Sequence, residues 1–346
     1  MKKTILILCK CFAAAVISLI ILSLISMVYY NPPIAIVQPD GITNFKYIPD
    51  TEWSFMWEGY GNGKTDNLGY NNAYHSDSSN PDIVFVGSSH LEGLQVPQEA
   101  NCVYLLNELF DKDNYSDNNF KCLNLGMSGH FFEVSASNYQ YIADEFKDAK
   151  YIVIEVFDAK YSPDVLDGMI EDKYHSPMEQ RSMLREMFLK VPYIRLVYKK
   201  ITETMPANGA SVSAENNVNA PSDKESELSV YTEKMNIVLS EISKISSENN
   251  IVPIILMHER FYENNDGEII LETDAEYKKA FKECCETNNL KVVDVSSEMV
   301  AEYLATYNLS YGFSNSAPGE GHLNKIGHRI IAQTMYKTIN EMEGLR

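Results

Sequence analysis

A short stretch of the chain joins a buried-strand pattern to a candidate nucleophile. Residues 81–93 read PDIVFVGSSHLEG. The apolar, β-branched run 83–86 ends at Gly87, which is typical of a buried strand followed by a turn. Ser89 lies on this turn, ahead of a helical pattern over 98–110. A serine between a strand and a helix is held at the edge of a sheet, where it could act as a nucleophile in acyl transfer. An ordinary Gly-Ser turn would explain the same stretch equally well.

A second group of reactive side chains lies near the end of the chain. Residues 318–331 read PGEGHLNKIGHRII, so that Glu320 lies two residues before His322. Asn324 can cap a helix whose apolar face begins with Ile326. A histidine is the usual base for a serine hydroxyl, which is a weak nucleophile until its proton is removed. The two stretches together therefore suggest serine chemistry.

From residue 81 onward, strand and helix patterns alternate. The sequence predicts strands over 82–87, 121–125, 151–157, 251–258 and 291–295. It predicts helices over 98–110, 134–146, 229–249, 273–287, 296–306 and 324–342. Such alternation predicts a parallel sheet with helices on both faces. The predicted fold class is α/β, a three-layer α/β/α arrangement around a mostly parallel, flavodoxin-like five-stranded sheet, preceded by one transmembrane helix.

Several polar or small residues follow these strands directly. They are Ser89, Gly126, Asp158, His258 and Ser296. Binding sites in open α/β sheets lie at the carboxyl ends of the strands. We therefore expect these residues to share one edge of the sheet, which supports a site there.

The chain resembles the SGNH (GDSL-like) hydrolases, especially their membrane-anchored branch near the bacterial glycan O-acetylation proteins. The resemblance covers roughly residues 81–342. GSSH at 87–90 stands where the family has Gly-Asp-Ser-Leu, and NLG at 124–126 stands at the second block. VIE at 153–155 lies in the third strand, and EGHLN at 320–324 is the last block. An early serine and a late acid-x-His, just before the last helix, follow the chain order of that family.

The resemblance implies a catalytic triad. Ser89 would be the nucleophile and His322 the base that takes its proton. Glu320 stands where the resembling branch has an aspartate, and it would hold the imidazole in the correct tautomer and stabilise the imidazolium.

An oxyanion hole needs donors aimed at the developing negative charge. The backbone N–H groups of Ser89 and Gly126 fit by position. The third donor of the family is an asparagine, but residues 157–159 here read Phe-Asp-Ala. Asn124 or His130 could supply that donor instead, or the site is weaker than in the family.

Other histidines compete for a role. We expect His90 to point away along the turn after the serine. His258 ends its strand and could line the pocket. His328 is expected to be structural, on the last helix. His130 could contact the substrate, but none of these four histidines is assigned a direct chemical role.

The N-terminal segment is apolar. Residues 11–29 carry no charge and are long enough to span a bilayer, and Lys2, Lys3 and Lys10 precede them. The positive-inside rule then predicts a single-pass protein of the bacterial cell membrane, with a cytoplasmic N-terminus and an extracytoplasmic catalytic domain. A cleavable signal peptide is the competing interpretation, but no clear cleavage site follows the apolar run.

Composition excludes some functions. A formal net charge of -19 disfavours nucleic acid and wide adhesion to anionic lipid. The six cysteines show no metal-binding spacing, and no cofactor or metal is expected. Cys102 and Cys122 could form a disulfide outside a cell, or remain as free buried thiols.

The predicted organisation has three parts. Residues 1–30 form the signal-anchor, 31–80 an extracytoplasmic lead-in or flap, and 81–346 the SGNH-like domain. In the lead-in, the alternating aromatics Trp53, Phe55 and Trp57 indicate an edge strand or a flap. A flap could lie beside a sugar site, but packing against the main domain is the favoured role.

Two insertions interrupt the domain. Residues 176–201 form a basic helical segment that could lie on the membrane, contact a membrane partner, or pack on the domain. Residues 204–227 lack large apolar side chains and are predicted to be disordered.

These observations predict a membrane-anchored extracytoplasmic serine esterase or O-acyltransferase. It would act on acyl groups, most simply acetyl, of a cell-surface polysaccharide or glycan. The alternative is a non-catalytic binding subunit of a membrane acyltransferase complex, favoured by the missing asparagine and the basic segment.

Overall fold

A five-stranded parallel sheet forms the centre of the protein in the computed structural model, which describes residues 2–37, 42–72, 80–112, 120–174, 191–204 and 224–344. Its strands are β6 (Ile83–Val86), β7 (Cys122–Asn124), β8 (Tyr151–Val156), β9 (Val252–Met257) and β12 (Lys291–Asp294). The order is β12-β9-β8-β6-β7, with every pairing parallel. The first strand thus lies between the second and the third, which is the flavodoxin-like order that the sequence predicted.

Helices cover both faces of this sheet. One face carries α3 (Cys102–Lys112), α11 (Ser296–Thr306) and α12 (Lys325–Met342). The other carries α4 (Phe132–Ser137), α5 (Tyr139–Glu145), α6 (Pro163–Ile170), α9 (Lys224–Asn249) and α10 (Ala275–Thr287). Within β6, Ile83 and Phe85 enter one core, while Val84 and Val86 enter the other, as the two-residue repeat of a strand requires. The three-layer α/β/α prediction is confirmed.

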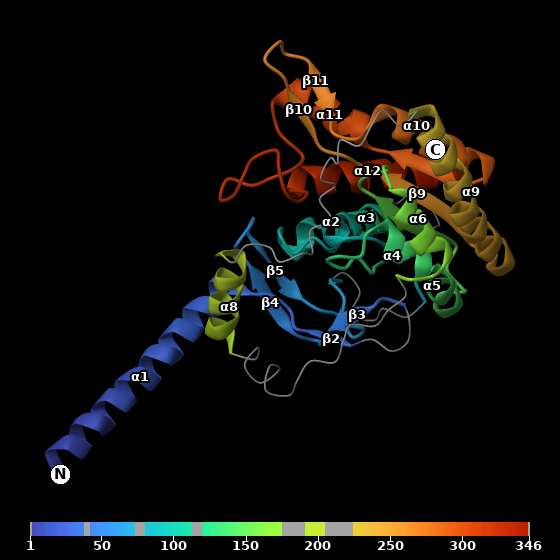
Figure 1. Ribbon diagram of the computed structural model, residues 1–346. Coiled ribbons are helices and arrows are strands. Elements are labelled where there is room, and N and C mark those ends of the chain that lie inside the picture. The colour runs from blue at the N-terminus through green and yellow to red at the C-terminus, as the bar shows by residue number, and fades with distance from the viewer. Residues whose placement is uncertain are drawn as a thin grey trace.

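The predicted elements recur with small differences. The helix expected over 98–110 is a 3-10 turn, η1 (Gln98–Ala100), followed by α3, and the one expected over 134–146 divides into α4 and α5. Three features were missed. They are the one-turn α2 (Ser89–Glu92), α6, and a hairpin of β10 (Phe261–Glu263) and β11 (Ile269–Leu271). Figure 1 shows this hairpin standing away from the sheet.

The lead-in to the main domain has its own antiparallel strands. β1 (Tyr30–Asn31), β4 (Glu52–Phe55) and β5 (Gly61–Lys64) form a sheet in the order β1-β4-β5. A second pair joins β2 (Ala35–Val37) to β3 (Phe45–Tyr47). Tyr47 and Tyr70 enter one core of the main domain, which confirms that the lead-in packs against this domain. Trp53 and Phe55 lie on β4, which is the middle strand of its sheet and not the expected edge.

The N-terminal helix extends away from the rest of the protein. α1 (Lys2–Tyr29) is long and apolar enough to cross a membrane, and its most apolar stretch is 0% buried inside the protein. α8 (Pro192–Thr204) packs beside the end of α1 that joins the main body (Figure 1).

The two predicted insertions lie partly outside the described residues. Of the basic segment 176–201, positions 176–190 are outside them, and positions 192–201 belong to α8. Of the segment 204–227, positions 205–223 are outside them. Its first residue ends α8 and its last four begin α9, so the prediction of disorder is wrong at these two ends. Cys102 and Cys122 are buried and free.

Candidate active site

The turn after β6 presents Ser89. Ser88 is extended and caps α2, with its Oγ accepting the backbone N–H of His90 at 3.2 Å. Ser89 is then the first residue of α2. The strand-turn-helix placement predicted for the nucleophile is therefore what the structure shows. A side chain at Gly87 would meet Glu155 Oε2 at 2.4 Å, so only glycine fits at the start of this turn.

His322 lies against the candidate nucleophile. Its Nε2 is 2.9 Å from Ser89 Oγ. The loop that carries it is fixed on both sides, because Gly312 N–H donates to the His322 carbonyl at 2.9 Å and Asn324 caps α12. The structure thus brings together the serine and the histidine that the sequence selected.

The carboxylate on the other side of His322 belongs to Glu58. Its Oε2 is 2.7 Å from His322 Nδ1, and its Oε1 accepts the His322 backbone N–H at 2.9 Å. Burial alone would raise the pKa of Glu58, but the hydrogen bonds and charge of His322 outweigh it and hold this pKa below its usual value. A carboxylate that stays ionised can keep a proton on Nδ1, which leaves Nε2 free to act as a base.

Glu320, which the sequence predicted for this role, is exposed. The backbone between Glu320 and His322 passes through Gly321, which has a φ of +70°. A side chain at Gly321 would meet Glu58 Oε1 at 2.2 Å, so the Glu58 carboxylate fills the space beside the histidine. The expected triad acid is therefore corrected from Glu320 to Glu58.

Contacts at the tip of the β4–β5 hairpin hold Glu58 in place. Gly59 N–H donates to Asn315 Oδ1 at 2.9 Å, and Asn315 Nδ2 donates back to the Gly59 carbonyl at 2.8 Å. Tyr60 N–H donates to the Gln95 carbonyl at 2.9 Å. The hairpin is thus joined to the loop before His322 and to the segment after Ser89. No local pattern in residues 31–80 signals this docking.

Two of the three predicted oxyanion donors are engaged elsewhere. Gly126 N–H donates to Asn124 Oδ1 at 2.8 Å. The Asn124 amide is fully buried and donates to the Leu91 carbonyl at 2.8 Å. Asn124 therefore braces the loop after β7 against α2 and does not point an N–H at the serine. Ser89 N–H, the first predicted donor, has no acceptor among the described residues.

The loop after β7 contains one N–H group that is a different candidate donor. Met127 N–H donates to the Gly87 carbonyl at 2.9 Å, and His130 N–H to the Met127 carbonyl at 3.0 Å. The Ser128 hydroxyl donates to the buried carboxylate of Glu92. Gly129 N–H is left without an acceptor in the described part of the chain. Its φ is +84°, and a side chain there would meet nothing within 4 Å, so the residue lies beside open space on that side.

A buried network lies beneath the nucleophile turn. Glu155, on β8, accepts the Ser88 backbone N–H and also contacts His258 Nε2 at 2.8 Å. His258 Nδ1 is 2.7 Å from the Tyr311 hydroxyl. The three side chains are all buried. His258 was a candidate for lining the pocket, but both of its ring nitrogens contact buried side chains of this network, which holds the turn that carries Ser89.

His90 was expected to point away, yet its ring is close to the reacting groups. It stacks on Phe157 with 4.5 Å between ring centroids and lies 5.2 Å from the ring of His322. Burial lowers the pKa of His90 well below its usual value, so the ring is neutral. Its Nδ1 accepts the Leu323 backbone N–H at 3.3 Å, which leaves the proton on Nε2.

The remaining candidates do not reach the triad. His328 is buried and accepts the Cys102 N–H at 3.2 Å, so its structural role is confirmed. His130, which was a possible contact for the substrate, is buried against Phe45, and its Nε2 has no partner within the described residues; its burial does not favour that contact. Ser296 Oγ donates to Asp294 at 2.6 Å, away from Ser89.

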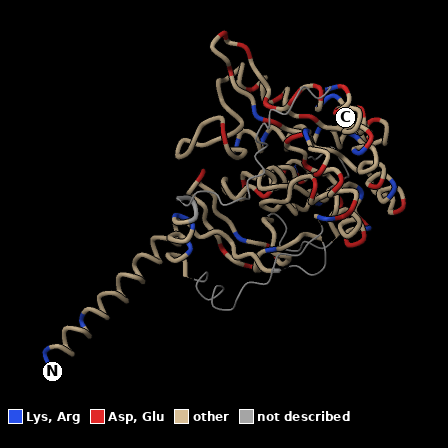
Figure 2. The backbone as a smooth tube through the Cα atoms, viewed as in Figure 1, with Lys and Arg blue, Asp and Glu red and all other residues tan. Residues whose placement is uncertain are grey.

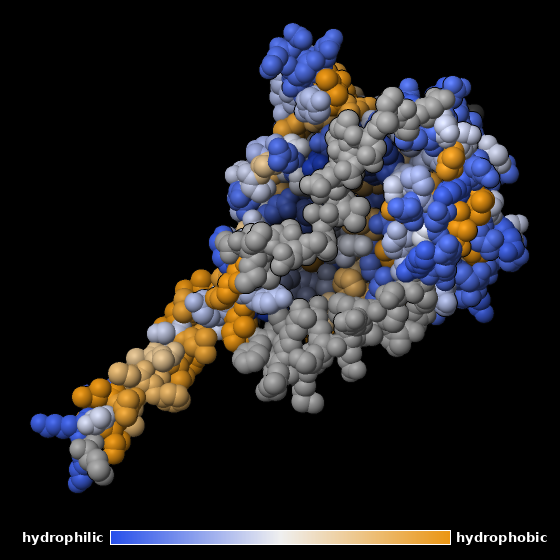
Figure 3. Space-filling view, in the orientation of Figure 1, coloured by the Kyte–Doolittle hydropathy of each residue, from blue (hydrophilic) through white to orange (hydrophobic). Residues whose placement is uncertain are grey.

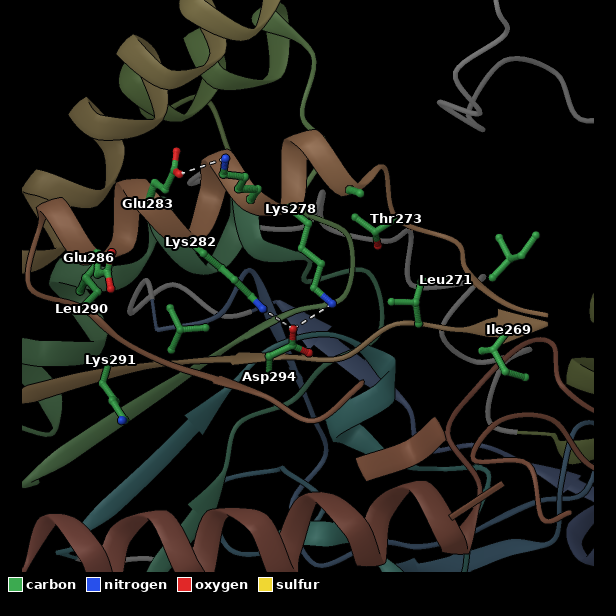
Figure 4. Close-up of a pocket in the computed structure, with 14 residues that line it drawn as sticks. Ile269, Leu271, Thr273, Lys278, Lys282, Glu283, Glu286, Leu290, Lys291 and Asp294 are labelled. Carbon is green, nitrogen blue, oxygen red and sulfur yellow. Dashed lines mark hydrogen bonds and ion pairs between the residues drawn. The ribbon is translucent and has the colours of Figure 1, made fainter. Parts of the chain in front are cut away.

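A cavity of about 910 Å³ lies elsewhere, between the β10–β11 hairpin, α10 and β12 (Figure 4). Its lysines Lys278 and Lys282 reach Asp294 at 2.8 and 2.5 Å, and Lys278 also pairs with Glu259, so two carboxylates balance the two ammonium groups. The described residues contain no group of three or more His, Cys, Asp or Glu side chains that could hold a metal ion.

Comparisons with known proteins give structural likenesses only. No family model and no curated protein matches the chain. Among solved structures, an acetyl xylan esterase, AlAXEase, is 14% identical, with 74% of this chain and 98% of that chain covered and a TM-score of 0.39. A lipolytic G-D-S-L family protein of Veillonella parvula is 12% identical, covering 75% and 97%, with a TM-score of 0.34. A GDSL-like lipase of Bacteroides thetaiotaomicron is 10% identical, covering 78% and 93%, with a TM-score of 0.33. With scores this low, we take no activity from these likenesses.

Proposed function

We propose that the protein is a serine esterase or O-acyltransferase. The observation that carries this proposal is the hydrogen-bonded series of Ser89 Oγ, His322 and Glu58, with contacts of 2.9 and 2.7 Å. A nucleophile, a base and an orienting carboxylate in this geometry are what acyl transfer through a covalent intermediate requires.

The reaction would proceed in two stages. His322 Nε2 takes the proton of Ser89 as Oγ attacks the acyl carbonyl, and the imidazolium then protonates the departing alkoxide. The second stage reverses these roles, because His322 activates water or a sugar hydroxyl that attacks the acyl-serine. Glu58 stabilises the imidazolium in both stages. The N–H groups of Ser89 and Gly129 would receive the negative charge on the carbonyl oxygen.

The proposed setting is the outer face of a bacterial cell membrane. α1 would be the anchor, and the three lysines before residue 11 favour a cytoplasmic N-terminus. The substrate would then be an acylated, most simply acetylated, cell-surface glycan. A membrane acyltransferase is a suitable partner if the acyl group arrives through the membrane.

An active-site serine probe tests this function. The full chain in detergent should react with a fluorophosphonate at Ser89, and mass spectrometry should find the adduct on the peptide that contains residue 89. Ser89→Ala should abolish the labelling, while Ser88→Ala, which changes the neighbouring hydroxyl, should retain it. Ser88 caps α2, so circular dichroism must first show that this variant is folded.

The alternative is a non-catalytic subunit that keeps the fold. It is favoured by the run Phe157-Asp158-Ala159, which follows β8 and lacks the donor asparagine of the resembling family. A folded protein that neither reacts with the probe nor turns over a small acetyl ester would support this alternative.

A further inference from the structure

Aromatic side chains surround the outer end of α1. Trp57 lies edge-on to Tyr29, with 6.3 Å between ring centroids, and to Tyr30, with 5.9 Å. Met56 N–H donates to the Tyr29 carbonyl at 2.9 Å, which joins the end of α1 to the chain that follows β4. Tryptophan and tyrosine concentrate where a transmembrane helix crosses the membrane surface.

α8 adds positive charge at the same place. Lys200 Nζ lies 4.7 Å from the centre of the Trp57 ring, and Lys199 Nζ lies 5.9 Å from it. Arg195 binds Asn31 Oδ1 and the Pro32 carbonyl, so it fastens α8 to the exit of α1. We call Tyr29, Tyr30, Trp57, Lys199 and Lys200 the collar.

The collar differs in charge from the rest of the protein. α8 reads PYIRLVYKKITET, with three basic residues and one acidic residue, in a chain of net charge -19. Val197, Tyr198 and Ile201 are also exposed on α8. In Figure 2, basic residues lie at the junction of α1 and α8, and in Figure 3 the apolar surface of α1 extends up to it. Exposed apolar and basic side chains together are typical of a helix at a lipid surface.

The collar is also linked to the triad. Trp57 directly precedes Glu58, whose carboxylate binds His322 at 2.7 Å. The positive charge of Lys199 contributes to the lowered pKa of Glu58, after the larger effects of burial and of His322. A ligand that shifted Trp57 on binding to the collar would therefore also shift the neighbouring Glu58.

We infer that the collar binds the anionic headgroups of a lipid bilayer and that this contact helps to position Glu58 against His322. The inference rests on the proposed anchoring by α1, and it goes beyond the proposed reaction. Basic residues near a membrane surface are attracted by anionic lipid. Lys199 and Lys200 would bind lipid phosphate, and Trp57 would lie at headgroup depth. The wide acidic surface of the main domain would remain turned away from the bilayer.

Trp57 fluorescence tests the contact without reference to activity. The chain has two tryptophans, so Trp53→Phe leaves Trp57 as the single reporter. This full-length variant is placed in vesicles of phosphatidylcholine alone or mixed with phosphatidylglycerol, each with acyl chains brominated near the headgroup. We expect stronger quenching in the anionic vesicles, and loss of that difference in Lys199→Gln/Lys200→Gln.

A matched control removes the same charge elsewhere. Lys279→Gln/Lys291→Gln lies at the cavity between α10 and β12 and should keep the difference in quenching. Equal quenching of Trp57 in both vesicle types would overturn the inference, as would a difference that survives in Lys199→Gln/Lys200→Gln. Trp57 that is quenched in neither would also overturn it, as expected if the collar instead docked on a membrane protein.

The effect on the triad is measured as the rate of fluorophosphonate labelling of Ser89 in the same vesicles. Anionic lipid should raise this rate for the parent and for the control variant, but not for Lys199→Gln/Lys200→Gln. An unchanged rate in the parent would overturn the link to Glu58. Failure of the proposed function is distinguishable, because the quenching result can be obtained with Ser89→Ala, in which no labelling occurs.

Discussion

Glu58 and His322 are 264 positions apart in the sequence, yet the two oxygens of one carboxylate bind both the ring Nδ1 and the backbone N–H of the histidine. This bidentate contact fixes the position and the rotation of the ring together. It also makes the lead-in segment part of the candidate site, because Glu58 lies between β4 and β5.

The first prediction separates the two candidate acids. Glu58→Gln should lower kcat for a small acetyl ester by roughly 10³–10⁴-fold, since a neutral amide no longer stabilises the imidazolium. Glu320→Gln should leave kcat nearly unchanged, because Glu320 is exposed and its charge is not needed at the ring. Steady-state kinetics of the two variants makes the comparison. The assignment of Glu58 is wrong if the effects are reversed.

A second prediction concerns the serine and the histidine as a unit. Ser89→Ala and His322→Ala should each abolish turnover of the acetyl ester, and the double variant should be no slower than either one. When two residues act in the same step, removing one of them already removes most of what the other contributes to the rate. Thermal unfolding of each variant serves as the control for folding. Additive losses would indicate that the two side chains act in separate steps.

The third prediction follows from the lowered pKa of Glu58. A carboxyl whose folded-state pKa is depressed adds stability above its unfolded pKa and loses it as pH falls through the folded value. The melting temperature of the wild type should therefore exceed that of Glu58→Gln near neutral pH. The gap should close only below the ordinary glutamate range, which is about pH 4.3. A gap that is constant across an acid titration would contradict this account.

The sequence was sufficient for the parts of the site that are set by local pattern. The run 83–86 followed by Gly87 predicted the turn that presents Ser89, and Asn324 predicted the helix start beside His322. Both depend on residues within a few positions of one another. The parallel sheet was predictable for the same reason, since its strands are short apolar runs between amphipathic helices.

Glu58 could not be found in this way. Its place depends on a hairpin held by Asn315 and Gln95, and nothing near Glu58 in the sequence encodes those partners. Asn124 was misassigned for a related reason. An asparagine beside the site is as suitable for bracing a loop as for binding an oxyanion, and only the contact with Leu91 shows which of the two it does.

The fourth prediction tests that structural role. Asn124→Ala should leave the Leu91 carbonyl and the Gly126 N–H without their buried partners, at a cost of about 1–3 kcal/mol for each unsatisfied group. We expect a fall of several degrees in the melting temperature, measured by differential scanning calorimetry. Asn62→Ala on β5 is a surface control that should change it little. A variant with full stability and lost turnover would restore Asn124 as an oxyanion donor.

The last prediction is whether the acyl group passes to water or to a sugar. The triad acid lies one residue from Trp57, which contacts the end of α1, so the reacting serine is held near the proposed anchor. A transferase supplied by a membrane partner needs that proximity, whereas an esterase that only removes acyl groups gains little from it. An oriented sugar hydroxyl can compete with water because its effective molarity can reach about 10⁵ M or more. We therefore expect transfer when a suitable glycan is bound and hydrolysis when none is present.

The measurement supplies an acetyl ester with and without a panel of oligosaccharides and weighs the products by mass spectrometry, with Ser89→Ala as the blank. Acetylated glycan that appears only with the intact serine supports transfer. Free acetate alone, together with removal of acetyl groups from the same glycans, would establish the esterase and exclude transfer to that panel.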